Sequence, residues 1–302
     1  YFLNKVEMKK CFFKHDIKTP DFISIPDKES FISATQQANF PMIIKPSDGR
    51  GARGVLYLDE NIDLDWAYEH SIASCENKQL ILERYIEGPQ LSVEGFFIKG
   101  KYSAIGFADR NYNNLEETKP FVVEDGGQIP SRYEGKILKE IEKLIQDGAE
   151  SLGISWGTVK ADIVMSSEGP QIIELAGRLS GNYFATHHIP MAYGIDLVGS
   201  LIKISMGQDI KKEDLIPKHN KFVAVRYFFP KEGVVKSIEG VENVCAQSYC
   251  RFFDMFINKG DVQKVIDSHV QRAGVVICDG DDYETAKSRT EESVRKIKFF
   301  ID

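Results

Sequence analysis

The sequence predicts a mixed α+β (α/β) fold of two or three packed lobes, and three observations carry this prediction. The length of 302 residues is enough for several lobes. Short apolar runs bounded by turn residues alternate with segments of helical periodicity along the whole chain. The composition, with 42% hydrophobic and 27% charged residues, is that of an ordinary soluble globular protein.

Charge, hydropathy and cysteine spacing exclude several classes of protein. The net charge of −7 leaves no basic surface for nucleic acid. No apolar run approaches the ~20 residues that a membrane span needs. The opening residues 1–5 do not form a signal peptide and include no initiator Met, so the chain looks cut at its front. Five scattered cysteines without a CxxC pair predict reduced thiols in a cytoplasmic protein, rather than zinc or a disulfide framework.

The first elements follow from periodicity and from capping residues. Residues 4–15 predict a helix that separates apolar side chains from lysines. Residues 22–25 predict a short strand, and Pro26-Asp27 begins a helix that runs to about Ala38. Residues 40–58 then predict a strand, a loop and a second strand.

The loop between these two strands holds Gly49, Gly51 and Gly54. The spacing Gly-x-Gly-x-x-Gly matches the dinucleotide fingerprint, but that motif leads into a helix and here a strand follows. The Gly-Lys-Ser/Thr of a Walker A motif is absent as well. We therefore interpret the loop as a glycine-rich flap whose backbone N–H groups approach phosphates, with Lys45 at its base. An ordinary hairpin with a basic tip is the alternative.

The middle of the chain predicts a hairpin, a long loop and the clearest helix of the sequence. A strand at residues 79–83 leads into Gly88-Pro89, and strands at 91–98 and 102–108 follow around a tight turn. Residues 109–133 are polar and are broken by proline and glycine, which predicts a long loop. Residues 134–152 carry apolar side chains on one helical face. Further helices or strands are predicted at 62–73, 195–206, 222–229 and 282–298.

A second hairpin, at residues 158–165 and 171–175, places Asp162 and Glu174 on neighbouring strands. Facing side chains there can converge on one cation, and Mg²⁺ binds one or two carboxylates together with nucleotide phosphates. The alternative is a pair of solvent-facing edge carboxylates, but Glu174 sits in an apolar run where a lone carboxylate is costly to bury. Arg178 follows, either as a partner for a phosphate or an anionic intermediate or as an ion-pair partner of Glu174.

Together these motifs resemble the ATP-grasp superfamily over nearly the whole chain, because they come in that family's order. The resemblance implies two α+β lobes that clasp the nucleotide and a small C-terminal α/β domain. It implies ATP and Mg²⁺ as cofactors, Asp162 and Glu174 as metal ligands, and Lys45 and Arg178 as catalytic residues. Residues 83–86 resemble the hinge that reads adenine. The implied nucleotide contacts are Lys5, Lys45, Ser47, Gly51, Gly54, Glu83, Arg84, Tyr85, Ile86, Gln90 and Glu94.

Two positions depart from the family pattern. Members often carry Glu after the hinge Gly-Pro to hold the ribose; here the residue is Gln90, which leaves Glu94 to share that role. Many carry Asn two residues after the second metal carboxylate; here it is Ala176, which implies a less complete second magnesium site. The run at residues 174–181 is closer to the amino-acid and dipeptide ligase branch. The family's N-terminal pre-ATP-grasp domain is missing from this sequence.

The resemblance divides the chain into an opening helix at 1–16, a lid lobe with the flap at 17–84, a central lobe with the metal hairpin at 85–210 and a C-terminal domain at 211–302. It implies an ATP-dependent carboxylate–amine ligase that forms an amide through an acyl phosphate on small, amino-acid-like substrates. A homodimer and a separate N-terminal domain or chain stay open as partners. Candidate substrate contacts, for which solvated loop residues are the alternative, are Asp109, Arg110, Glu124, Ser180, Gly181 and Asn182.

Two other functions remain open. A biotin-carboxylase-like or carbamoyl-phosphate-synthase-like enzyme would activate bicarbonate with the same flap and carboxylates. A non-catalytic ATP-binding subunit would keep the fold without turnover. Ala176 and the missing N-terminal domain motivate the subunit, whereas the intact Lys5, Lys45, Asp162, Glu174 and Arg178 argue against it.

Overall fold

The computed structural model describes residues 3–302, apart from the side chain of residue 212, so residues 1–2 of the predicted opening segment lie outside it. In this part of the chain every pairing between named strands is antiparallel. The strands form a four-stranded sheet, an eight-stranded sheet and a three-stranded sheet, with helices packed against them. The predicted α+β fold is confirmed. No helix of the described residues is long and apolar enough to span a membrane.

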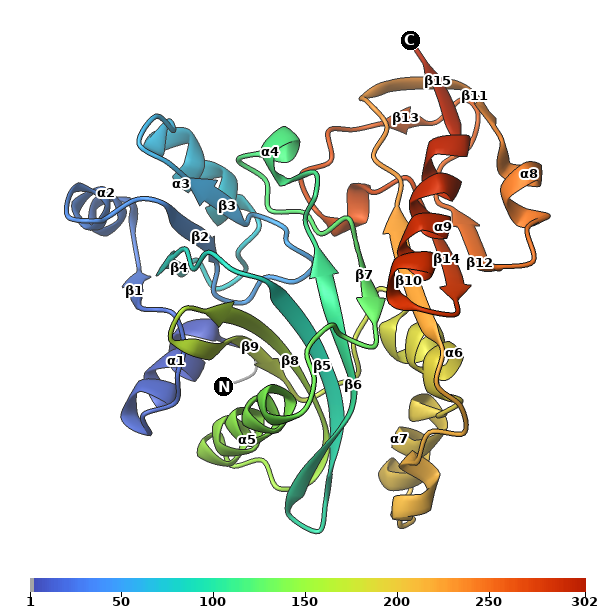
Figure 1. Ribbon diagram of the computed structural model, residues 1–302. Coiled ribbons are helices and arrows are strands. Elements are labelled where there is room, and N and C mark those ends of the chain that lie inside the picture. The colour runs from blue at the N-terminus through green and yellow to red at the C-terminus, as the bar shows by residue number, and fades with distance from the viewer. Residues whose placement is uncertain (1–2) are drawn as a thin grey trace.

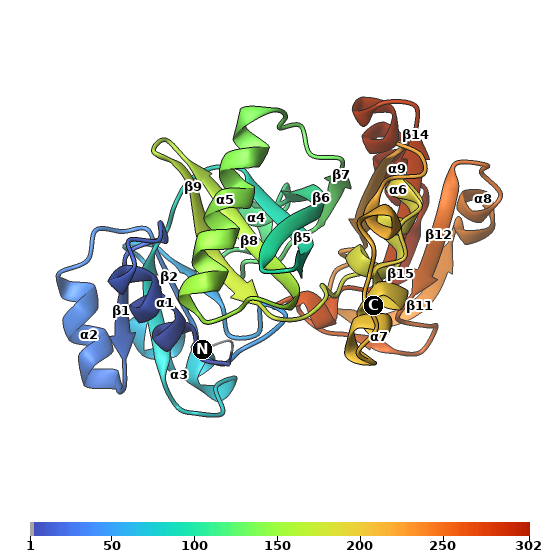
Figure 2. The ribbon, with the colours of Figure 1, turned by 90° about the horizontal axis from the view of Figure 1, so that it is seen from below.

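The four-stranded sheet has the order β1-β4-β2-β3 and lies at one end of the molecule (Figures 1 and 2). Helices α2 and α3 cover it, and the side chains of Asp27 and Asp63 cap their first turns by accepting backbone N–H groups. The flap joins β2 to β3, which pair directly, so the predicted order of strand, loop and strand is confirmed. The element bounds are β1 Phe22–Ile25, α2 Lys28–Gln36, β2 Met42–Pro46, β3 Leu56–Leu58, α3 Leu64–Ala73 and β4 Leu80–Arg84.

The eight-stranded sheet has the order β12-β14-β10-β7-β6-β5-β8-β9. Helix α5 carries Ile141 and Ile145 onto one face, where Met8 and Phe12 of α1 join the same apolar core. Residues of the 184–204 region, including those of α6 and α7, cover the other face. The bounds of these elements are α1 Lys5–Lys14, β5 Gln90–Ile98, β6 Lys101–Asn111, α5 Lys136–Ser151, β8 Gly157–Ser166, β9 Gly169–Ala176, the π-helical turn Phe184–His188, α6 Ile189–Tyr193 and α7 Leu197–Ser205.

The C-terminal strands continue the same sheet. β10 pairs with β7, and β14 and β12 extend the sheet to its far edge, with α9 packed on β10 and β14 (Figure 1). The predicted division into lobes stays a prediction. The bounds are α4 Leu115–Thr118, β7 Gly126–Ile129, the 3₁₀ turn Lys212–Leu215, β10 Phe222–Tyr227, β11 Gly233–Glu239, α8 Val241–Cys245, β12 Cys250–Met255, β13 Val262–Gln263, the 3₁₀ turn His269–Gln271, β14 Gly274–Gly280, α9 Tyr283–Lys296 and β15 Lys298–Ile301.

The prediction of a long polar loop at residues 109–133 is wrong. β6 runs on to Asn111, α4 follows, and β7 fills the space between β6 and β10. The glycines that suggested a turn serve close strand packing. A Cβ at Gly126 would lie 2.1 Å from the carbonyl oxygen of Val225, and one at Gly127 would lie 2.5 Å from that of Asp109. Glycine therefore allows β7 to fit between two strands.

Candidate functional site

A cavity of about 330 Å³ lies where the flap, the hinge at 83–86, the metal hairpin β8–β9 and the C-terminal section meet. Its lining comes from both large sheets and from residue 269, so segments far apart in sequence enclose it. Three predicted nucleotide contacts, Ser47, Gly54 and Glu94, are not among its lining residues. The other predicted site residues line it: Lys5, Lys45, Gly51, Glu83, Arg84, Tyr85, Ile86, Gln90, Asp109, Arg110, Glu124, Asp162, Glu174, Arg178, Ser180, Gly181 and Asn182.

Glu83 lies between two lysines at the hinge end of the cavity. Its carboxylate oxygens are 2.8 Å from Lys45 Nζ and 3.2 Å from Lys9 Nζ, and all three side chains are buried. Burial alone would raise the pKa of Glu83, but the two ammonium groups hold that pKa below its usual value. Burial lowers the pKa of Lys9 to about 8. The predicted contact of Glu83 with adenine stays a prediction, while the structure shows Glu83 as the counter-ion of Lys45.

The opening helix anchors the root of the flap. The backbone N–H of Lys5 donates to Ser47 O at 2.8 Å, and Lys5 Nζ donates to Gly49 O at 2.8 Å. The same ammonium group lies 3.7 Å from a carboxylate oxygen of Glu174. Burial lowers the pKa of Lys5, which Glu174 opposes. Lys5 therefore connects the flap with the β8–β9 hairpin, and its contact with the nucleotide phosphates stays a prediction.

Ser47 and Gly54 lie at the two ends of the flap and contact residues outside it, Asn77 and Ser74. The Ser47 hydroxyl is fully buried and hydrogen-bonds the Asn77 side chain at 2.8 to 3.0 Å. Gly54 has a φ of +67°, and a Cβ there would lie 2.9 Å from Ser74 Cβ. Direct contacts of these two residues with ATP stay predictions; the contacts that the structure shows are structural. Gly51, in contrast, has no heavy atom within 4 Å of the position that a Cβ would take, at the tip of the flap.

Asp162 and Glu174 are directly opposite each other in the register of β8 and β9, as the hairpin predicted. Asp162 Oδ1 lies 3.2 Å from Arg110 Nη1, and its other oxygen contacts Lys160 Nζ. Burial would raise the pKa of Asp162, but Lys160 and Arg110 hold it far below its usual range.

The paired carboxylates fit Mg²⁺, which takes one or two protein carboxylates and completes its shell with phosphate oxygens and water. Both line the cavity beside Lys5. The described residues hold no cluster of three or more His, Cys, Asp or Glu side chains that could bind a metal by themselves. A magnesium ion at this position would therefore depend on the nucleotide for much of its coordination.

Arg178 is exposed, and its Nη1 donates to Leu179 O at 3.1 Å. In the described part of the chain it forms no ion pair with Glu174, so the alternative of an internal salt bridge is not what the structure shows. Its guanidinium lines the cavity next to the metal hairpin. A role on a transferred phosphoryl group stays a prediction that this position permits.

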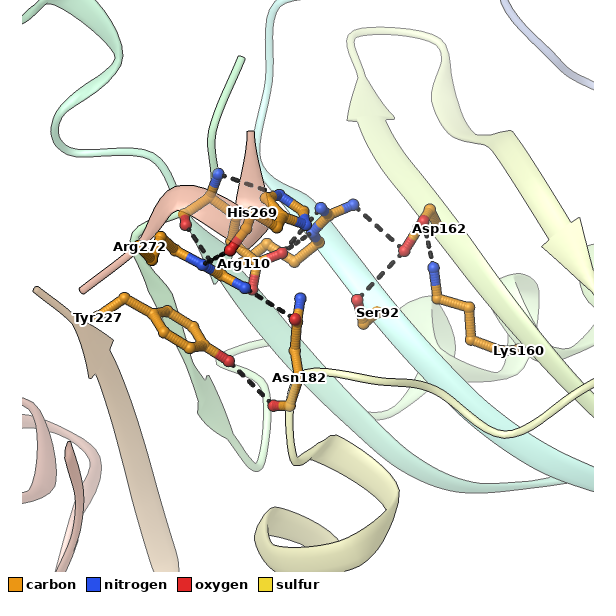
Figure 3. Close-up of polar contacts among 9 residues, drawn as sticks. Ser92, Arg110, Lys160, Asp162, Asn182, Tyr227, His269 and Arg272 are labelled. Carbon is orange, nitrogen blue, oxygen red and sulfur yellow. Dashed lines mark hydrogen bonds and ion pairs between the residues drawn. The ribbon is translucent and has the colours of Figure 1, made fainter. Parts of the chain in front are cut away.

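Among the candidate substrate contacts, Asp109 and Arg110 lie on β6 and Glu124 is buried, whereas Ser180, Gly181 and Asn182 are loop residues; contacts of all six with a substrate stay predictions. Arg110 lies on β6 and contacts Glu124 Oε2 at 2.8 Å (Figure 3). The Asp109 carboxylate accepts from Arg132 Nε and from Tyr283 OH, both at 2.8 Å, which ties it to α9. Ser180, Gly181 and Asn182 form the loop after β9. Arg110 and Glu124 therefore supply one positive and one negative side chain to the same wall of the cavity.

The sequence interpretation missed several residues around the cavity. Lys9 was assigned to the polar face of its helix but is completely buried; its position four residues after Lys5 was the available signal. Lys160 lies two residues before Asp162 on the same side of β8, where alternation would have placed it.

His188 lines the cavity with a buried Nε2 that has no hydrogen-bond partner, and burial lowers its pKa to about 3. His269 and Arg272 had no local signal.

Glu94 is fully buried beneath the loop after β9, and its carboxylate accepts the backbone N–H of Ser180 at 2.9 and 3.3 Å. Burial raises the pKa of Glu94 to about 7, against the opposing effects of Ser180, Lys160 and Arg178. Its predicted ribose contact stays a prediction. The structure shows instead a carboxyl group that positions the 180–182 loop.

Glu94→Gln is expected to stabilise the protein at pH 8 but much less at pH 5. The folded state binds the Glu94 proton more tightly than the unfolded chain, so the wild type loses stability as pH rises from about 4.5 to about 7. The loss between pH 5 and pH 8 corresponds to about 2 to 3 kcal/mol. Urea unfolding of both proteins at the two pH values measures it. An equal stability difference at both pH values would contradict a buried, titrating Glu94.

The fold and cavity define an α+β protein in which a glycine-rich flap and a carboxylate-bearing hairpin face one nucleotide-sized cavity. The family model described as "ATP-grasp domain" matches residues 2–182, and the chain belongs to the ATP-grasp family. A second model, "L-amino acid ligase C-terminal domain 2", matches residues 226–302. The resemblance to ATP-grasp proteins and to their amino-acid ligase branch is thus confirmed.

Individual relatives agree with this assignment. The chain is 21% identical to the uncharacterized protein y4rH of Sinorhizobium fredii over 99% of its own length and 61% of the relative's. It is 25% identical to a D-alanine–D-alanine ligase of Pseudomonas fluorescens, over 70% and 65% of the two lengths. The chain therefore spans less than two thirds of either relative. The crystal structure of an L-amino acid ligase from Bacillus licheniformis has the same fold, with a TM-score of 0.82 at 15% identity over 100% of this chain and 72% of that one.

Proposed function

We propose that this protein is an ATP-dependent carboxylate–amine ligase that joins small, amino-acid-like substrates through an acyl phosphate. The observation that carries the proposal is that one cavity brings together phosphate-binding groups, metal ligands and a charged pair. Lys5, Lys45 and the facing carboxylates of β8 and β9 line it together with the flap. The oppositely charged Arg110 and Glu124 line it as well, with Arg110 3.2 Å from Asp162.

The cavity supplies positive charge and metal ligands for the nucleotide. Bound Mg²⁺ would neutralise phosphate charge, and Asp162 and Glu174 are the residues that would hold it. Lys5 and Lys45 line the same cavity and would pair with phosphate oxygens. Arg178, which is exposed and has no carboxylate partner among the described residues, would stabilise charge on the transferred phosphoryl group.

The reaction then consists of two displacements. The substrate carboxylate attacks the γ-phosphorus of ATP, forms an acyl phosphate and releases ADP. The amine attacks the acyl carbon, the C–N bond forms, phosphate leaves and the amine gives up a proton. Such chemistry depends mainly on positioning and charge stabilisation. The flap would exclude water, which would otherwise hydrolyse the acyl phosphate.

Arg110 and Glu124 suit a zwitterionic substrate. The Arg110 guanidinium can hold a carboxylate and the Glu124 carboxylate can hold an ammonium group, in exchange for the contacts that Arg110 now makes with Glu124 at 2.8 Å and with Asp162 at 3.2 Å. The names of the D-alanine–D-alanine ligase and L-amino acid ligase relatives support the same class of substrate. A homodimer and a separate N-terminal domain or chain stay predictions.

Phosphate release from magnesium-ATP tests the proposed function. The protein is incubated with pools of amino acids, with other small carboxylates and with bicarbonate, each with and without an amine. Release that requires both a carboxylate and an amine, together with an amide product in the mass spectrum, is the expected result. Release with bicarbonate alone would establish the carboxylase-like alternative instead. ATP binding without release in any pool would favour the non-catalytic subunit.

A further inference from the structure

Residues 268–272 of the C-terminal section join the flap to the cavity wall that bears Glu124, and the proposed reaction assigns them no role. The backbone N–H of His269 donates to the carbonyl oxygen of Gly51 at the flap tip, at 3.0 Å. The Nε2 of the same histidine accepts the backbone N–H of Glu124 at 3.4 Å. A segment that follows the flap by more than 200 residues therefore holds the flap tip against the wall that bears Glu124.

Arg272 fixes this segment in place. Its guanidinium, only 3% exposed, donates in three directions: Nε to His269 O at 2.9 Å, Nη1 to Glu124 O at 3.2 Å and Nη2 to Asn182 Oδ1 at 2.8 Å (Figure 3). It stacks on the Tyr227 ring at 3.5 Å, and the Tyr227 hydroxyl donates to Asn182 O at 3.1 Å.

The acceptors of Arg272 are all neutral oxygens, and within the described residues it forms no ion pair with a carboxylate. Burying a guanidinium without a counter-ion is costly, and here burial lowers its pKa. Three acceptors in different directions match the rigid fork of arginine and not the single ammonium group of lysine. The Arg272 side chain therefore sets the relative positions of three segments, which carry His269, Glu124 and Asn182.

We propose that Arg272 is a positioning residue that couples closure of the flap to the 180–182 loop. Through His269 it keeps the flap tip attached at Gly51, and through Asn182 it keeps the loop in place. The description of the flap as the part that closes over ATP rests on the proposed function. The coupling means that the flap closes fully only when the 180–182 loop is ordered.

Trypsin cleavage of the flap measures this coupling without any turnover. Arg50 and Arg53 are exposed on the flap, on either side of the carbonyl group that His269 holds. Arg272→Gln and Arg272→Lys are expected to raise cleavage after Arg50 and Arg53 at least about tenfold over the wild type, because a charge-assisted contact is lost. Cleavage after the exposed Lys99, at the turn between β5 and β6 and far from this cluster in sequence, serves as the internal reference and is expected to stay unchanged.

Arg295→Gln is the matched control, because Arg295 is an exposed arginine on α9. Thermal unfolding shows which variants are folded. Where Arg272→Gln does not fold, Arg272→Lys and Tyr227→Phe carry the test, since Tyr227→Phe removes only the hydroxyl that holds Asn182. Flap cleavage at the wild-type rate in the folded variants would overturn the proposal. An equal increase at Lys99 would also overturn it, because it would show general destabilisation.

Steady-state kinetics separates this inference from the proposed function. If the wild type is a ligase, Arg272→Lys is expected to lower kcat and to raise the KM for ATP together, as loss of flap closure requires. A wild type without turnover would refute the proposed function and leave the cleavage test intact. Unchanged flap cleavage with an active wild type would refute the role of Arg272 alone.

Discussion

Glu174→Gln is expected to lower the rate of magnesium-ATP-dependent phosphate release at least about a hundredfold, while the protein stays folded. The amide is neutral and cannot neutralise a divalent cation. The substitution also removes the ion pair between Glu174 and Lys5 Nζ, which are 3.7 Å apart. This ion pair joins the β8–β9 hairpin to the root of the flap. The Glu174 side chain is 26% exposed, and the buried Lys5 ammonium that is left behind keeps its hydrogen bond to Gly49 O at 2.8 Å, which limits the loss of stability. Phosphate release and thermal unfolding, measured on the same preparation, give both quantities.

Glu168→Gln is the matched control for this variant. Glu168 is an exposed carboxylate at the turn of the same β8–β9 hairpin. The control is expected to keep wild-type activity, and Asp162→Asn is expected to behave like Glu174→Gln because the two residues face each other in register. Full activity of Glu174→Gln would remove the assignment of the metal site.

Lys45→Ala is expected to weaken ATP binding about tenfold or more and also to destabilise the fold. The Lys45 ammonium is buried and lies 2.8 Å from Glu83, so its loss leaves that buried carboxylate with Lys9 alone. Removing one partner of a buried ion pair costs about 3 to 5 kcal/mol when no other partner remains, and Lys9 makes the cost smaller here. Calorimetric titration with ATP and urea unfolding measure the two effects.

The double variant Lys45→Ala/Glu83→Gln separates binding from stability. It removes the uncompensated carboxylate, so we expect part of the lost stability to return while ATP binding stays weak. Recovery of ATP affinity in the double variant would show that Lys45 acts only through Glu83. Lys10→Ala, at an exposed position on α1, is the control for the loss of one positive charge. An ATP affinity of Lys45→Ala equal to that of the wild type would refute the flap interpretation.

The parts of the fold that local patterns specify were predictable. The flap could be predicted because proline and glycine residues border two short apolar runs, and these runs pair as β2 and β3 in the structure. The two facing carboxylates could be predicted because a short turn sets the register of a hairpin. In the structure Asp162 faces Glu174. Strand β7 could not be predicted from the sequence. Its Gly-Gly pair looks like a turn signal, but in the structure these glycines allow close contact with Asp109 and Val225 on the neighbouring strands.

Candidate site residues divide in the same way. Lys45, Asp162 and Glu174 could be proposed from local motifs and a family resemblance, and they line one cavity. The ion-pair partners of these residues could not be predicted, because Glu83, Arg110 and Lys5 reach Lys45, Asp162 and Glu174 from separate elements. Glu94 is a similar case, since it lies near the hinge in sequence and accepts the Ser180 N–H in the structure.

The sequence by itself determined the family, the flap and the order of the chemical groups, because each depends on residues that are close together in the chain. The tertiary structure alone decided which charges neutralise one another and what holds the flap. Those contacts join residues such as Gly51 and His269, whose approach depends on how β10, β12 and β14 extend the central sheet. Periodicity reports which face of an element is buried and not which distant element buries it, so such contacts follow only from the assembled fold.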